Sequence, residues 1–140
     1  MSIPYDPTLA PSTAPAITSF LASFYATSDN EALHEKYADS FTQDATLIMA
    51  SKVATGSEEI LSLRHGLWTH VFSRSHSVSR LYFGAQDSVM LYGKVVYTLK
   101  SDKEREIEVP WAARADFVLE PVVRMRFYQV YLGPSAQSGK

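Results

Sequence analysis

The stretch from Ser88 to Leu132 constrains the fold of this chain most. It contains three long runs rich in Val, Tyr, Phe and Trp, and the breaks between them fall at 101–103 and 120–121. Aromatic and β-branched residues suit a pleated, half-buried surface, whereas Ser, Asp and Pro suit turns. The pattern predicts three antiparallel strands, each longer than the usual strand of about five or six residues. A meander of such long strands must twist and curve.

Side chains alternate between the two faces of a strand, so the apolar positions predict the buried face. In the first run Tyr97 points inward with Val and Leu side chains, and in the second run Trp111 points inward. In the third run the alternation places Gln129 and Tyr131 on the interior face. Pro110 cannot donate to a central hydrogen-bond ladder, so it predicts a bulge or an edge in the second strand.

The composition excludes several classes of protein. The chain has 140 residues, of which 46% are hydrophobic and 20% charged, and its net charge is −2. These values predict one globular domain with its own core. The charge balance gives no support for nucleic-acid binding, and the absence of cysteines excludes disulfides and thiolate chemistry. There is no apolar run of about 18 residues and no signal-peptide pattern, so we expect no membrane partner and a cytoplasmic location.

The segment before the meander reads as mostly helical. Ser12 or Thr13 caps a first helix with apolar residues at helical spacing, and Asp29 caps a short second helix. A strand over 44–52 follows, and then a long helix over about 58–73 with a broad apolar face. The pattern after that helix is again typical of a strand.

This order of elements predicts an α+β fold. We expect a curved antiparallel sheet with the three helices of the N-terminal half on its concave face. The result is a cone whose open mouth is the natural place for a ligand. Residues 1–13 form an extended arm, either laid on the surface or disordered, residues 14–132 form the single domain, and residues 133–140 form a flexible tail.

Three local patterns, together with the order of elements, resemble a known superfamily. They are FLASFYATSD in the first helix, DATLIM in the first strand and TGSEEI at the start of the long helix. They are similar to those of the nuclear transport factor two-like superfamily, which includes scytalone dehydratase, ketosteroid isomerase and SnoaL-like polyketide cyclases. The resemblance covers residues 14–132 and implies the cone-shaped fold and a homodimer. The superfamily contains both enzymes without a cofactor and non-catalytic binding modules.

Residue by residue, the resemblance is partial. The first-helix tyrosine of scytalone dehydratase looks like Tyr25, and its histidine after the long helix looks like His76. The aspartate that follows this tyrosine in the dehydratase is Ala26 here. The carboxylate base of ketosteroid isomerase falls at Met49, which cannot take a proton. The resemblance therefore implies proton transfer by His76 and argues against the ketosteroid mechanism.

Two residues are the main candidates for chemistry. An imidazole such as His76, with an unperturbed pKa of about 6.5, can act as a general acid or base; the alternative is a histidine that caps a carbonyl or faces water. Arg64 lies among the leucines of the helical face, and a buried charge needs partners. It would polarise a substrate carbonyl. The alternative is an ion pair with Asp44, Glu58 or Asp116, or a packed stem with its head in solvent.

These candidates lead to one functional hypothesis. We expect a SnoaL-like enzyme that cyclises, isomerises or dehydrates a hydrophobic, oxygenated, polyketide-like molecule without a cofactor. His76 would transfer the proton, and Arg64 and Tyr25 would stabilise negative charge on a carbonyl oxygen. We expect no metal, because His65 and His70 are about 140° apart around the helix. The pocket is shaped by large, mostly aromatic side chains with polar tips, namely Trp111, Tyr97, Tyr131, Gln129 and Trp68.

The second hypothesis is a binding or dimerisation module without catalysis, and a ligand carrier is a third. In the second hypothesis the outer face of the sheet forms a homodimer or partner interface, since Tyr and Arg are enriched in interfaces. The residues expected on that face are Tyr92, Val96, Arg124, Arg126 and Tyr128. A filled cone would favour this module, and an open cavity with polar tips would favour an enzyme or a carrier.

Overall fold

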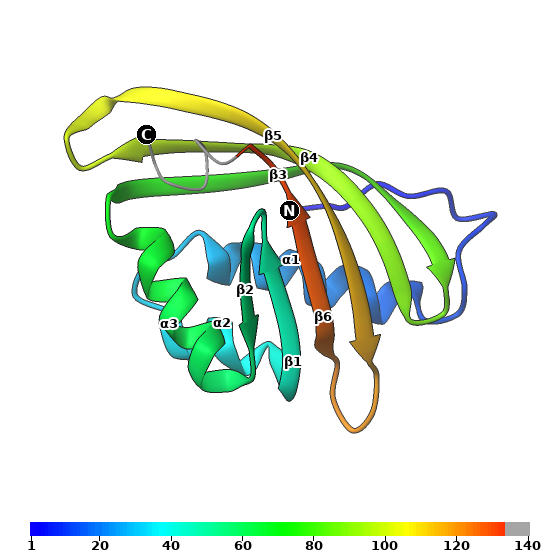
Figure 1. Cartoon of the computed structure of the whole chain (residues 1–140). Helices are drawn as coiled ribbons and strands as arrows, with labels where there is room; N and C mark the ends of the chain where they lie inside the picture. The colour runs from blue at the N-terminus through cyan, green and yellow to red at the C-terminus, as the bar shows by residue number, and fades with distance from the viewer. Residues whose placement is uncertain (134–140) are drawn as a thin grey trace.

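The computed structural model describes residues 1–133, in which three helices pack on one six-stranded sheet (Figure 1). The predicted flexible tail, apart from Gly133, lies outside the described residues. The strands lie in the order β2-β1-β6-β5-β4-β3. The helices are α1 (Ala14–Ser28), α2 (His34–Asp39) and α3 (Ser57–Trp68), and the strands are β1 (Phe41–Met49), β2 (Lys52–Thr55), β3 (Val71–Ala85), β4 (Ser88–Leu99), β5 (Asp102–Val118) and β6 (Arg124–Tyr131).

The elements form two layers. The long strands β3, β4 and β5 arch over α1, while α2 and α3 lie beside β1 and β2 (Figure 1). This arrangement confirms the α+β cone with its helices on the concave face. The sheet is mixed rather than wholly antiparallel, because β1 pairs with β6 in parallel. These two strands come from opposite ends of the domain, so no hairpin turn dictates their relative direction.

The last helix ends earlier than the sequence predicts. α3 stops at Trp68, and Val71 already pairs with Leu99 of β4. Val71 is buried and Phe72 is exposed, which is the alternation of a strand. Arg74, which directly follows the end of the predicted helix, is therefore a residue of strand β3.

Of the two alternatives for Pro110, a bulge or an edge, the structure shows the edge. This proline pairs opposite Lys94 without a shift in register, and β6 reaches β5 only from Ala112 onward. Pro110 therefore lies where one edge of β5 is unpaired, a position that tolerates proline. The side-chain phase is kept, and Trp111 faces the interior as predicted.

A bulge occurs on β6 instead. Arg126 is skipped in the pairing between β5 and β6. An extra residue of this kind reverses the side-chain phase beyond it. Tyr128 is therefore buried, and Tyr131 is 45% exposed. The prediction that Gln129 and Tyr131 face the interior is wrong, and so is the outward placement of Tyr128.

The N-terminal arm lies along the free edge of β3. The backbone N–H of Leu81 donates to the carbonyl oxygen of Pro4 at 2.9 Å. Ile3 is buried, and the Tyr5 ring packs edge-on against Phe83 with 5.7 Å between ring centroids. Of the two alternatives for the arm, the structure shows the one laid on the surface. In the part of the chain that the structure describes, no helix is both long and apolar enough to cross a bilayer.

Candidate active site

A cavity lies inside the cone, lined by side chains from all three helices and from β1, β3, β4, β5 and β6. Water-sized molecules can occupy about 60 Å³ of it. That space holds a few water molecules, and it is smaller than the several hundred Å³ of a common small-ligand site. The wall is largely aromatic and aliphatic, with polar groups that come from both the helices and the sheet. The interior is therefore neither filled nor purely apolar.

Asp29 and His76 form a hydrogen-bonded pair at this wall. Asp29 directly follows α1, and His76 lies in the first half of β3. Nδ1 of His76 is 2.5 Å from one carboxylate oxygen, and the backbone N–H of His76 donates to the other at 2.9 Å. Because an ionised carboxylate can only accept, Nδ1 carries the proton in the neutral ring. The lone pair of Nε2 is then free to take a proton from a bound molecule.

Two aromatic rings hold the imidazole in place. The Tyr25 ring lies 5.2 Å from it and the Trp111 ring 5.7 Å, between centroids. The His76 side chain is 16% exposed and lines the cavity. The ring is thus both fixed in orientation and accessible, which are the two geometric requirements for a general base.

Tyr25 packs against His76 but does not line the cavity itself. Its hydroxyl lies 2.9 Å from the hydroxyl of Tyr128, which does line the cavity. Burial raises the pKa of both tyrosines. Both therefore stay protonated near neutral pH and can donate hydrogen bonds. Tyr128 is the better placed of the two to contact a ligand.

Arg64 lies outside the cavity and binds the end of α1. Its guanidinium donates to the carbonyl oxygens of Ser28 at 2.8 Å, Asn30 at 2.7 Å and Thr27 at 3.3 Å, and Nε donates to His34 Nδ1 at 3.2 Å. No carboxylate of the described residues forms an ion pair with it. The predicted placement beside a substrate carbonyl is wrong, and so is the internal ion pair.

The position of Arg64 has a consequence for the site. Asp29 lies between Ser28 and Asn30, whose carbonyl groups Arg64 holds. Arg64 therefore fixes the backbone on both sides of the carboxylate that binds His76. Arg64 therefore acts on the candidate active site through Asp29, as a positioning residue.

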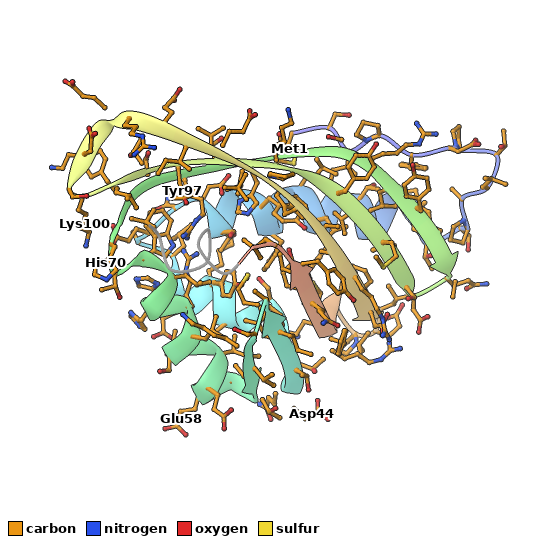
Figure 2. All side chains as sticks on the ribbon, turned by 45° about the horizontal axis from the view of Figure 1, so that its top comes forward. Met1, Asp44, Glu58, His70, Tyr97 and Lys100 are labelled. Atoms are coloured by element: carbon orange, nitrogen blue, oxygen red, sulfur yellow. The ribbon has the colours of Figure 1, made fainter. Side chains whose placement is uncertain are left out.

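The other predicted pocket residues divide into two groups. Trp111 and Tyr97 line the cavity as predicted, and Figure 2 shows Tyr97 near the end of the cone that carries the α3–β3 junction. Trp68 is buried behind the wall, where it packs against Tyr97 in a second apolar cluster. Gln129 and Tyr131 are on the opposite face of the sheet.

Three residues of the site were missed from the sequence. Arg74 could have been found, because it precedes His76 by two positions and so shares its face of the strand. Tyr128 was missed because the bulge on β6 carries no residue signal. The sequence predicts that Asp29 caps the second helix, but α2 begins only at His34, and nothing local indicates the contact of Asp29 with β3. Among the described residues, no group of three or more His, Cys, Asp or Glu side chains is arranged to hold a metal ion.

Comparison with known proteins identifies the fold. No protein-family model matches the sequence, and no curated protein matches it. Solved structures do match. A candidate scytalone dehydratase from Novosphingobium aromaticivorans is 14% identical with a TM-score of 0.70, over 86% of this chain and 83% of that one. The hexachlorocyclohexane dehydrochlorinase LinA type 2 is 18% identical with a TM-score of 0.69, over 87% and 86%.

A third match is a protein of ketosteroid isomerase-like fold from Catenulispora acidiphila, solved in complex with trimethylamine. It is 19% identical with a TM-score of 0.68, over 93% of this chain and 94% of that one. The chain therefore shares the fold of these structures, one of which is described as ketosteroid isomerase-like, and this agrees with the cone-shaped fold that the sequence patterns implied. At these identities the likeness shows the fold, and an activity has to be argued from the site.

Proposed function

We propose that this protein is an acid–base enzyme that needs no cofactor and acts on a hydrophobic, oxygenated small molecule. The observation that carries this proposal is the Asp29–His76 pair at the wall of a cavity with polar tips. A carboxylate that orients a histidine also stabilises the imidazolium that forms when the ring takes a proton. The site therefore has a base whose conjugate acid can return the proton within the same turnover.

Dehydration is the reaction that this arrangement fits best. Nε2 of His76 removes a proton from the carbon next to a carbonyl group, and the electron pair left on that carbon forms a carbon–carbon double bond. The bond to a β-hydroxyl group breaks, and the imidazolium gives its proton to the leaving oxygen. Water departs and the neutral imidazole is restored. In an isomerisation the proton would return to another carbon, and in a cyclisation the same carbon would attack a second carbonyl group.

Two further observations support an elimination. The names of two structural neighbours, a candidate dehydratase and a dehydrochlorinase, describe the loss of a small molecule from the substrate. The hydroxyl of Tyr128, kept protonated by burial, is suited to hydrogen-bond the substrate oxygen on which negative charge develops.

The test uses β-hydroxy-β-phenyl ketones as trial substrates. Exchange of their α-protons with D2O, followed by proton NMR, reports the first step even if no water is lost. We expect exchange that His76→Gln slows by about 10² or more. His70→Gln is the matched control, because His70 is an exposed histidine outside the cavity. If His76→Gln exchanges protons at the wild-type rate, the proposal is wrong, and a carrier becomes the better description of a protein that still binds these ketones.

We also propose that the protein forms a homodimer through the outer face of the sheet. Tyr82 of β3 and Tyr92 of β4 stack there with 6.5 Å between centroids. Tyr131 of β6 lies in the same row as Tyr92, because both pair with Ala112 of β5. A row of exposed aromatic side chains is typical of an interface. Sedimentation equilibrium should find a dimer that Tyr92→Glu dissociates, and a monomeric wild-type protein would contradict this.

A further inference from the structure

One wall of the cavity presents hydrogen-bond donors without acceptors to match. Arg74 of β3 lies directly opposite Tyr97 of β4 in the pairing of these strands, and both line the cavity. Side chains of directly opposite residues share a face and are neighbours. The Trp111 indole belongs to the same wall, on β5. An indole N–H and a guanidinium can only donate hydrogen bonds.

Arg74 has a positive charge that no ion pair neutralises among the described residues. One N–H of its guanidinium donates to the carbonyl oxygen of Leu67 at 2.7 Å, and its flat face lies 4.7 Å from the centroid of the Trp68 ring. Among the described residues, no carboxylate pairs with it. Burial, and then the charge of Arg64, lower the pKa of Arg74 to about 10, so it stays charged at neutral pH. A partly buried, charged guanidinium with remaining donors is suited to bind an anion.

The two other donors of this wall are also unused. Tyr97 Oη and Trp111 Nε1 are buried, and neither has a hydrogen-bond partner among the described residues. Leaving buried polar groups unpaired is costly, and a ligand that brings acceptor oxygens removes that cost. A neutral hydrocarbon would leave Tyr97 Oη, Trp111 Nε1 and the remaining N–H groups of Arg74 unpaired. The wall therefore selects a ligand with several acceptor atoms and a negative charge.

We propose that Arg74 and Tyr97 form a carboxylate-binding subsite, so that the substrate is a hydrophobic hydroxy or oxo acid. The inference rests on the proposed function and names the substrate class of the same cavity. Arg74 and His76 are two positions apart on the same strand, or about 7 Å. The Arg74 guanidinium extends toward Leu67 at the end of α3. The carboxylate is thus a remote anchor, several bonds from the carbon whose proton Nε2 of His76 removes.

The subsite is tested with a matched pair of probes, phenylpropanoate and phenylpropanamide, titrated into the protein by calorimetry. They differ only in charge and in one donor group. We expect wild-type protein to bind the carboxylate about tenfold to a hundredfold more tightly than the amide, as a charge-assisted contact implies. Binding of the carboxylate should weaken with added salt. Equal binding of the two probes, or no carboxylate binding at millimolar concentration, would overturn the proposal.

Variants assign the effect to the subsite. Arg74→Met keeps the packed stem and removes the charge, so it should lose the preference for the carboxylate, and Arg74→Lys should keep part of it. Tyr97→Phe should weaken carboxylate binding a few-fold. Arg105→Met removes an exposed arginine elsewhere and should change nothing. Carboxylate binding to a folded Arg74→Met protein at wild-type strength would refute the subsite. The comparison of the two probes on wild-type protein tests the proposal even if a variant fails to fold.

His76→Gln separates this inference from the proposed function. It should keep the preference for the carboxylate while it loses proton exchange. A carboxylate preference that depends on Arg74, without any exchange that depends on His76, would leave the subsite standing and remove the enzyme. Exchange that depends on His76, without the preference, would leave the enzyme and remove the subsite.

Discussion

Replacing Arg64 with methionine should destabilise the protein strongly, because its guanidinium is the main partner of the end of α1. Two of its acceptors, the carbonyl oxygens of Thr27 and Ser28, are in buried hydrogen bonds. A hydrogen bond from a charged group contributes about 1.5–3 kcal/mol, so these two bonds together give about 3–6 kcal/mol. The third acceptor, Asn30, is exposed and can turn to water. Against a usual total of about 5–15 kcal/mol, the loss is a large part of the stability.

The assay is urea unfolding followed by circular dichroism, with Arg105→Met as the exposed control. Arg64→Lys should fall between the two, since an ammonium group cannot reach several carbonyls with the geometry of a guanidinium. A loss below about 1 kcal/mol for Arg64→Met would refute this reasoning. A folded Arg64→Met protein that lost proton exchange would show that Arg64 acts on the site by positioning Asp29.

Two further predictions concern the sheet and pH. Gly93→Ala should cost at least about 2 kcal/mol or prevent folding, because a Cβ at that position would lie 1.9 Å from the backbone oxygen of Ser77. Gly66→Ala in α3, where a Cβ meets nothing within 4 Å, is the control for urea unfolding and should be neutral or stabilising. Burial, a neighbouring imidazole and the charge of Arg64 lower the pKa of His34 from 6.5, so the folded state favours its neutral form. The contribution of His34 to folding stability is therefore present above pH 6.5 and lost as the pH falls below that value. His34→Gln should flatten this part of the pH profile of the melting temperature. An unchanged slope in this variant would contradict the predicted direction of the pH dependence.

The sequence predicts the general architecture well, because it repeats the same signal over many residues. The alternation in β4 and β5 runs long enough to place Tyr97 and Trp111 correctly on the interior face. Pro110 is a single exception within this alternation, so it does not change the predicted face of the other residues. The same reasoning failed in β6, where one extra residue at Arg126 reverses the phase. A bulge depends on how two strands pair, and the sequence of one strand does not contain that information.

The sequence predicts the candidate site only in part, again because some contacts depend on how distant segments of the chain come together. His76 stood out by its chemistry and its place at the start of a strand. Its partner Asp29 is 47 positions away, and their contact exists only because α1 ends beneath β3. Arg64 was a plausible charged group for the site, since a buried arginine needs partners. Backbone carbonyl groups at a helix end satisfy that need as well as a substrate does, and periodicity cannot tell the two apart.

The account depends most on the claim that Asp29 and His76 act as one unit in proton transfer. The most direct test is the rate of α-proton exchange in Asp29→Asn, His76→Gln and the double variant, measured on the same ketone. We predict that Asn at position 29 slows exchange by about 10² or more, and that the double variant is no slower than His76→Gln alone, because residues that act together lose their effect together. Exchange at the wild-type rate in Asp29→Asn, or losses in the two single variants that multiply in the double variant, would contradict the account.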